Sequence, residues 1–133
     1  MANAKHLLVV DDQRDFTDFV VDVATRLGYT AQAANRVRQF QEMYVTQIPD
    51  VIILDIIMPE CDGIELIKWL AEKECRAQIM IASGSGDTYT RSAKLLGEAQ
   101  GSLRISVLHK PIKLDTLRTC LSEAATKDSL VTD

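Results

Sequence analysis

The stretch Val51-Ile52-Ile53-Leu54-Asp55 decides the fold class of this chain. Four consecutive apolar residues, most of them β-branched, are typical of a strand that is covered on both faces of a parallel sheet. The run then ends in a carboxylate, and a charged group at the end of a buried strand needs a partner or a solvated opening. The stretch therefore predicts a central strand whose carboxyl end carries a polar site.

Apolar strands and amphipathic helices alternate on both sides of this stretch. We expect strands at residues 7–10, 30–33, 51–54, 79–82 and 105–108. Apolar residues at three-and-four spacing predict helices over Phe16 to Leu27, Val37 to Tyr44, Ile64 to Leu70, Thr88 to Ala99, and Leu114 to Leu121. This alternation predicts an α/β protein with a doubly wound, five-stranded parallel sheet and five helices. In such sheets the ligand site lies at the carboxyl ends of the strands.

The length and composition limit the classes of function. A chain of 133 residues with 47% hydrophobic and 26% charged residues fits one domain, which we expect to span residues 1–133, with a core over about 6–125 and a frayed tail at 126–133. The net charge of −4 argues against binding to nucleic acid or to an anionic membrane. No apolar run approaches the about 20 residues of a membrane span, and no signal peptide is evident, which favours the cytoplasm.

The cysteines and histidines do not suggest a metal or redox site. Cys61, Cys75 and Cys120 are widely spaced and form no C-x-x-C pair, so neither a disulfide framework nor a zinc site is indicated. His6 and His109 stand alone beside expected strands, where a histidine is more often packed or solvated than bound to a metal.

Polar side chains follow four of the expected strands. Asp11 and Asp12 follow the first, Asp55 the third, Ser83 the fourth and Lys110 the fifth. Each alone has a structural explanation: Asp12 could cap the first helix, Ser83 could be a loop hydroxyl, and Lys110 could be a solvated charge. Folding does not require three carboxylates, a hydroxyl and an ammonium at one edge, however, so the set favours a functional site.

These residues belong to a recognisable pattern. It consists of Asp11-Asp12, a D-x-x-M-P-x-x-D-G run from Asp55 to Gly63, Ser83-Gly84 and Lys110-Pro111, in this order. Over nearly its whole length the sequence resembles the receiver domain of two-component response regulators, as in the chemotaxis response regulator. The resemblance implies a flavodoxin-like (βα)5 fold and a signalling phosphoacceptor rather than an enzyme.

The resemblance also implies a metal-assisted phosphorylation site. Asp55 would accept a phosphoryl group from a histidine of a sensor histidine kinase or a histidine phosphotransfer protein, with Mg²⁺ bound alongside. Asp12 and Asp55 would be direct ligands, Asp11 would act partly through metal-bound water, and the backbone carbonyl of Ile57 would complete the protein ligands. Carboxylates suit this role because Mg²⁺ prefers an octahedral shell of oxygen atoms.

Two further residues of the pattern have implied roles. Lys110 would hold a phosphoryl oxygen, and a cis bond to Pro111 would aim its side chain into the site. Ser83 would hydrogen-bond the phosphoryl group and pull its loop inward, so that phosphorylation shifts a conformational equilibrium.

The chain departs from the family near its output surface. Val107 stands where many receivers have an aromatic switch residue, and extra length lies near Leu96 to Ser106. The output is therefore left open: a downstream protein, a fused output domain, or a dimer formed on phosphorylation.

Four alternative interpretations of the sequence can be compared with the receiver domain. The chain could be a fragment of a larger regulator, such as an EAL-type cyclic-di-GMP phosphodiesterase, or a receiver-like module that is never phosphorylated. A haloacid-dehalogenase-like phosphatase would need an acid where Ile57 stands. A flavodoxin-like cofactor binder would need a phosphate-binding loop in place of Asp11 and Asp12.

Overall fold

The computed structural model describes residues 5–55, 57–58, 61–84 and 103–131. Its strands are β1 (His6–Val10), β2 (Thr30–Ala34), β3 (Val51–Asp55), β4 (Ile57–Met58), β5 (Cys61–Asp62), β6 (Gln78–Ser83) and β7 (Arg104–His109). Its helices are α1 (Arg14–Arg26), α2 (Val37–Thr46), α3 (Gly63–Glu72) and α5 (Leu114–Val131).

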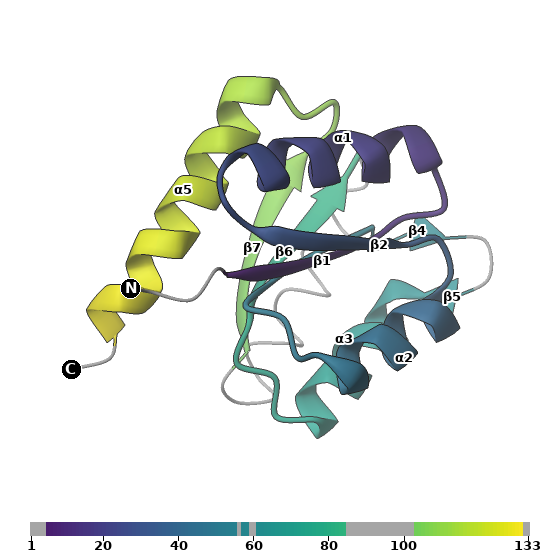
Figure 1. Ribbon diagram of the computed structural model, residues 1–133. Coiled ribbons are helices and arrows are strands. Elements are labelled where there is room, and N and C mark those ends of the chain that lie inside the picture. The colour runs from purple at the N-terminus through teal and green to yellow at the C-terminus, as the bar shows by residue number, and fades with distance from the viewer. Residues whose placement is uncertain (1–4, 56, 59–60, 85–102, 132–133) are drawn as a thin grey trace.

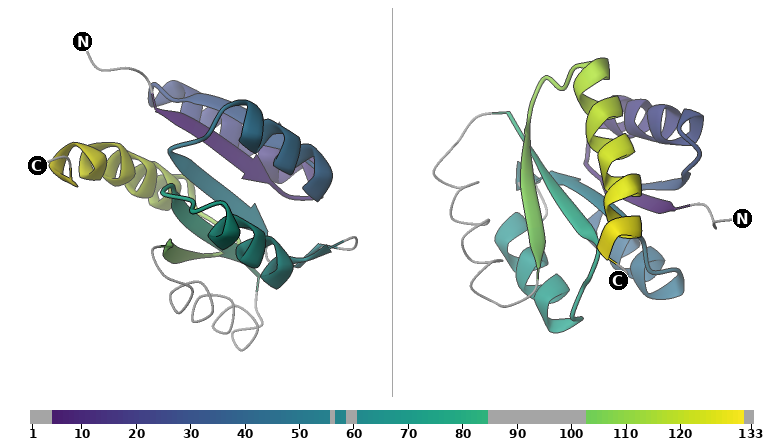
Figure 2. Two further views of the ribbon diagram at one scale, coloured as in Figure 1. Left: turned by 90° about the horizontal axis from the view of Figure 1, so that it is seen from below. Right: turned by 90° about the vertical axis from the view of Figure 1, so that its left-hand side faces the viewer.

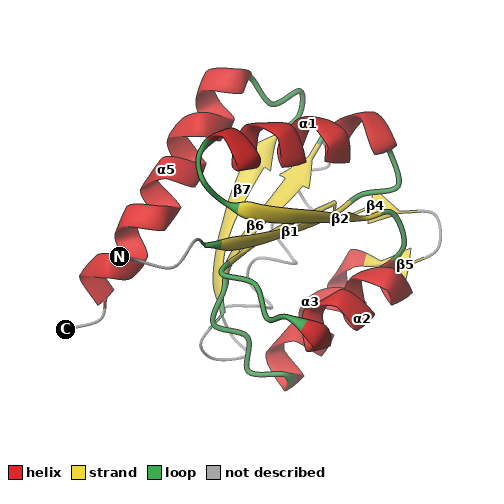
Figure 3. Ribbon diagram, in the orientation of Figure 1, coloured by secondary structure: helices red, strands yellow, loops and turns green. Residues whose placement is uncertain are grey.

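Five strands form one parallel sheet in the order β2-β1-β3-β6-β7. All five residues of β3 are buried at its centre, as the apolar run at 51–54 predicts. The strands, yellow in Figure 3, therefore point their carboxyl ends to one edge of the sheet. The predicted α/β fold with a five-stranded parallel sheet is confirmed.

Helices cover both faces of this sheet. Figure 1 shows α1 and α5 on one side and α2 and α3 on the other, and the two views of Figure 2 agree. Successive residues of β1 point alternately to these two layers: Leu7 and Val9 pack in the cluster with α1 and α5, whereas Leu8 and Val10 pack in the cluster with α2 and α3. The chain is thus doubly wound around two apolar cores.

Helix α1 ends at Arg26, two residues before Gly28. Gly28 has a φ of 97°, a conformation that is strained for residues with a side chain. The backbone N–H of Leu27 donates to the carbonyl groups of Val23 and Ala24, and that of Gly28 donates to Thr25.

The structure differs from the prediction at two places. Between β3 and α3 the chain contains the antiparallel pair β4 and β5, which is too short for hydrophobic periodicity to predict. Helix α5, expected over Leu114 to Leu121, continues to Val131 through a stretch without glycine or proline, and the fraying expected at 126–133 stays a prediction.

Other predictions in the later part of the chain are confirmed or fall outside the described ranges. Strands β6 and β7 and the start of α5 lie where they were expected. The helix predicted over Thr88 to Ala99, and most of the extra length near Leu96 to Ser106, lie outside the described residues. Within the four described ranges, no helix is both long and apolar enough to span a membrane.

Candidate functional site

The register of β1 and β3 places two aspartates side by side. Val10 pairs with Leu54, so the next residues, Asp11 and Asp55, leave neighbouring strands together. Adjacent strands are about 4.8 Å apart, which brings their side chains within reach of one cation. Carboxylate oxygens of Asp11, Asp12 and Asp55 all lie within 4.8 Å of one another. The structure thus gathers the three predicted acids into one cluster.

Strands β6 and β7 bring the other two predicted residues to the same edge. Asp55 pairs with Ala82, so the next residue, Ser83, lies beside the end of β3. Ser83 in turn pairs with His109, the residue before Lys110. The backbone N–H of Lys110 donates to the Ser83 carbonyl at 2.7 Å, and this hydrogen bond joins the carboxyl ends of β6 and β7. The peptide bond between Lys110 and Pro111 is cis, as the sequence resemblance implies.

Lys110 forms the main electrostatic contact of the site. Its Nζ lies 2.7 Å from Oδ2 of Asp11 and 4.0 Å from Oδ2 of Asp55. The Asp11 side chain is fully buried, and its Oδ1 accepts a hydrogen bond from the backbone N–H of Gln13 at 2.9 Å. A buried carboxylate requires such partners, since an unpaired charge in the interior is costly. Both oxygens of Asp11 are therefore engaged.

Asp12 has a different environment from Asp11. It is exposed at the start of the α1 segment, whose N-cap residue is Gln13, without a side-chain capping hydrogen bond. The alternative that Asp12 serves only as a helix cap is thus not supported. An exposed carboxylate beside a buried pair is accessible from solvent, which suits the binding of an incoming cation.

Ser83 and Val107 lie near the cluster on β6 and β7. Ser83 is 4% exposed at the last position of β6. Val107, which stands where many receivers carry an aromatic residue, is half-buried on β7 and pairs with Ile81. The carbonyl of Ile57, predicted as a metal ligand, belongs to the β4 backbone, and its role stays a prediction.

Asn35 supports the acidic loop and was missed by the sequence analysis. Its Nδ2 donates to the Asp11 carbonyl at 3.0 Å and contacts Thr17 Oγ1 at 3.4 Å, while the Asp11 N–H donates to the Ala34 carbonyl at 3.1 Å. Asn35 directly follows β2, so the rule that polar residues follow the strands at this edge could have identified it.

Phe16 is a second residue that sequence reasoning did not place in the site. Its ring centroid lies 4.5 Å from Nζ of Lys110. The sequence predicts Phe16 only as part of the apolar stripe of α1. Nothing in the sequence pairs it with a lysine at the far end of the chain, because that contact depends on how α1 packs over the sheet.

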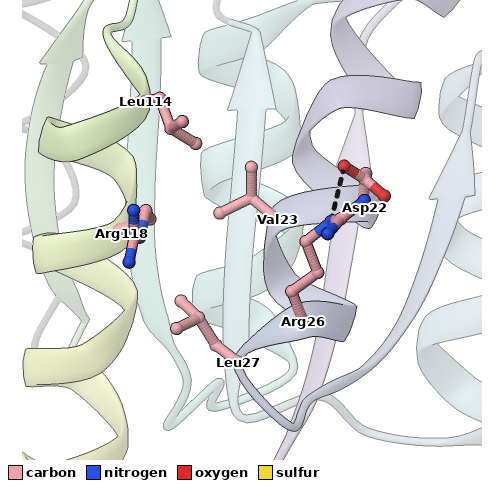
Figure 4. A pocket seen from close by; sticks show the side chains of 6 residues that line it. All are labelled: Asp22, Val23, Arg26, Leu27, Leu114 and Arg118. Atoms are coloured by element: carbon pink, nitrogen blue, oxygen red, sulfur yellow. Dashed lines mark hydrogen bonds and ion pairs between the residues drawn. The ribbon is translucent and has the colours of Figure 1, made fainter.

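A separate groove lies between α1 and α5, away from these residues. Figure 4 shows its side chains on facing turns of the two helices. Its volume is about 400 Å³, and the ion pair between Arg26 Nε and Asp22 Oδ2, at 3.1 Å, borders it. The groove is lined by Asp22, Val23, Arg26, Leu27, Leu114 and Arg118. None of these residues belongs to the acidic cluster, so the groove is separate from the candidate site.

The donor set of the cluster fits Mg²⁺. Three carboxylates offer hard oxygen ligands, and the exposed position of Asp12 leaves room for the waters that Mg²⁺ retains. Soft ligands, which would favour zinc or copper, are not part of this cluster.

Comparisons with known proteins agree with this geometry. The response regulator receiver domain family matches residues 7–122. The sporulation initiation phosphotransferase F of Bacillus subtilis is 32% identical over 126 residues, which cover 92% of this chain and 94% of that protein. The chemotaxis protein CheY of Thermotoga maritima is 35% identical over 83 residues, covering 62% of this chain and 69% of that protein.

Some relatives are much longer than this chain. The regulatory protein AtoC of Escherichia coli is 25% identical over 98% of the chain, which spans only 27% of that protein. The relatives thus include both short proteins and longer ones of which a receiver domain is a part.

Solved structures show the same fold. A response regulator from Colwellia psychrerythraea superposes with a TM-score of 0.79 at 27% identity, covering 94% of this chain and 99% of that one. The response regulator CheY4 of Vibrio cholerae has a TM-score of 0.77 at 23% identity, with 92% and 99% covered. With a family match over residues 7–122 and the acidic cluster at the expected sheet edge, the chain belongs to the receiver domains of two-component response regulators.

Proposed function

We propose that Asp55 is the residue of this receiver domain that accepts the phosphoryl group, donated by a phosphohistidine of a sensor histidine kinase or a histidine phosphotransfer protein. The observation that carries the proposal is the convergence of three carboxylates and the Lys110 ammonium at one sheet edge. The chain would act as a phosphoacceptor in signalling, and its only reactions would be its own phosphorylation and dephosphorylation.

The reaction is a phosphoryl transfer between two side chains. A carboxylate oxygen of Asp55 forms a bond to phosphorus while the phosphorus–nitrogen bond of the phosphohistidine breaks, and the imidazole nitrogen keeps the electron pair. The product on Asp55 is an acyl phosphate. Because an anionic carboxylate attacks an anionic phosphoryl group, catalysis depends mainly on positioning and charge neutralisation.

The cluster supplies that neutralisation. Mg²⁺, when bound, would offset the charge that develops on the phosphoryl oxygens. Asp12 and Asp55 are the better candidates for direct ligands, because both oxygens of Asp11 already accept hydrogen bonds from Gln13 and Lys110. Asp11 would then act through water, and the Ile57 carbonyl would complete the protein ligands. Lys110, whose Nζ lies 4.0 Å from Oδ2 of Asp55, would bind a phosphoryl oxygen on that residue.

Ser83 would report phosphorylation to the rest of the domain. It is buried at the end of β6, directly after the residue that pairs with Asp55. A hydrogen bond from its hydroxyl to a phosphoryl oxygen would favour one of two conformations of the segment that follows. Because Val107 replaces the aromatic residue of many receivers, we propose that this coupling runs through Ser83 rather than through an aromatic switch.

The experiment that tests the proposal uses acetyl phosphate and Mg²⁺, followed by intact mass spectrometry. Wild type should gain one phosphoryl group and Asp55→Asn none. Asp18→Asn, an exposed aspartate of α1 outside the cluster, should behave as wild type. Equal labelling of wild type and Asp55→Asn, or no labelling of wild type, would contradict the assignment.

A further inference from the structure

The contact between Phe16 and Lys110 has no place in the pattern of site residues described above. Phe16 lies in the first turn of α1 and is half-buried against the α1–α5 core. The Lys110 ammonium lies 4.5 Å from its ring centroid, within the roughly 6 Å at which a ring face attracts a cation. A phenylalanine in an apolar stripe thus also contacts the central cation of the site.

We propose that Phe16 is a positioning residue, whose ring holds the Lys110 ammonium where it can bind the phosphoryl group that is transferred to Asp55; this rests on the proposed function. Lysine carries its charge on a flexible stem of four carbons, so a defined position requires contacts around the ammonium. Asp11 supplies one contact at 2.7 Å and the Phe16 ring supplies another. Asp55 Oδ2 lies 4.0 Å away, beyond hydrogen-bond distance.

An aromatic ring suits this position better than a second acid would. A carboxylate at position 16 would form its own ion pair with Lys110 and compete with the phosphoryl group. The ring attracts the ammonium through its quadrupole and leaves the positive charge available. It also occupies space that water would otherwise fill, and the Lys110 side chain is only 21% exposed.

The backbone ties the ring to the acidic loop. The N–H groups of Phe16 and Thr17 donate to the Gln13 carbonyl, at 3.1 and 3.2 Å. The N–H of Gln13 in turn donates to Asp11 Oδ1. The backbone of Phe16 is therefore linked to the Asp11 carboxylate through Gln13, and Lys110 contacts both side chains.

The test compares two phenylalanines of α1. Phe16 and Phe19 are both half-buried against the same core. Of these two rings, only that of Phe16 contacts a cation among the described residues. We expect Phe16→Leu to slow phosphorylation by acetyl phosphate about threefold to tenfold, while Phe16→Tyr restores the rate and Phe19→Leu leaves it unchanged. A small-molecule donor removes any effect on docking of a partner protein.

A second measurement isolates the cation contact from packing. Phenylalanines with increasing ring fluorination at position 16 keep the shape but weaken the attraction for cations. The phosphorylation rate should fall along this series. In the metal-free, unphosphorylated protein, the NMR signals of the Lys110 side chain should lose their ring-current shift in Phe16→Leu and keep it in Phe19→Leu.

The outcomes separate this inference from the proposed function. If wild type is phosphorylated on Asp55 but the fluorinated series shows no trend, the positioning role is wrong and the function stands. Equal slowing in Phe16→Leu and Phe19→Leu would likewise reduce Phe16 to a packing residue. If wild type takes up no phosphoryl group, the proposed phosphoacceptor function is wrong. Lys110 NMR signals that are unchanged in Phe16→Leu would show, independently, that the contact between Phe16 and Lys110 is absent.

Discussion

At the scale of single residues, the site is a balance between three carboxylates and one ammonium. Lys110 neutralises Asp11 directly through the contact at 2.7 Å. Asp12 and Asp55 remain close to that pair, with oxygens within 4.8 Å of one another. Like charges at this separation repel each other unless a cation binds. Repulsion within the cluster would therefore destabilise the metal-free domain, and a bound dication would reduce this repulsion.

This balance predicts that Asp12→Asn stabilises the metal-free protein. The variant removes one exposed negative charge without disturbing the buried pair of Asp11 and Lys110. A gain of about 1 kcal/mol would raise the Tm by about 4 °C in a domain of this size. Wild type should melt at a higher temperature with Mg²⁺ than without it, and Asp12→Asn should lose most of this difference.

The control for that measurement is Asp18→Asn, which removes an exposed charge of α1 outside the cluster. It should keep the full response to Mg²⁺. Thermal melts in which Asp12→Asn and Asp18→Asn respond alike would show that repulsion within the cluster does not affect stability.

The residues predicted from sequence share one property. Asp11 and Lys110 directly follow apolar strands, and Asp55 and Ser83 are the last residues of such strands. Their place at the edge therefore follows from the direction of parallel strands and from the family pattern. Phe16 could not be assigned in this way. Its contact with Lys110 depends on a side-chain position above the sheet, which the pattern along the chain does not encode.

At the scale of elements, β6 and β7 link the site to the edge of the sheet. Their register pairs Ser83 with His109, and the N–H of Lys110 donates to the Ser83 carbonyl at 2.7 Å. A displacement of Ser83 on phosphorylation would therefore reach β7 through the backbone. With Val107 in place of an aromatic residue, no large ring is available on β7 at that position to carry the change.

This coupling predicts the behaviour of Ser83→Ala. The variant should still accept a phosphoryl group, since Asp55 and Lys110 are intact, but phosphorylation should shift the amide NMR signals of β7 much less than in wild type. Ser106→Ala is the matched control, because Ser106 lies in the middle of β7, away from the Ser83 pairing, and contacts Gln78. Undiminished β7 shifts in phosphorylated Ser83→Ala would refute the proposed route.

Element prediction from sequence succeeded where periodicity is long enough to be read. Helices α1, α2 and α3 show apolar residues at three-and-four spacing, and β3 shows a continuous apolar run. The pair of β4 and β5 has two residues in each strand, which carry no period. The end of α5 was placed too early because its polar residues suggest a tail, although they are compatible with a helix.

At the scale of the whole molecule, the two faces of the sheet bury different kinds of side chain. The face covered by α2 and α3 contains an aromatic cluster, in which the Tyr44 and Trp69 rings lie 5.3 Å apart. The hydroxyl of Tyr44 hydrogen-bonds the buried thiol of Cys75. Burial raises the pKa of both groups above their ordinary values, because desolvation disfavours the charged forms. Folding therefore becomes less favourable at alkaline pH, where the unfolded chain releases protons that these buried groups still bind in the folded protein.

The free energy of unfolding should accordingly fall as the pH rises above 9. The pKa of Cys75 is raised from its ordinary value of 9.0, so above that pH the unfolded chain releases a proton that the folded protein still binds. Stability is then lost with a slope of at most about 1.4 kcal/mol per pH unit for this thiol. Urea unfolding followed by Trp69 fluorescence between pH 7 and 10 measures the slope. Cys75→Ala should be less stable at pH 7 yet show a flatter decline, and parallel curves for the two proteins would mean that the buried thiol is not the group responsible.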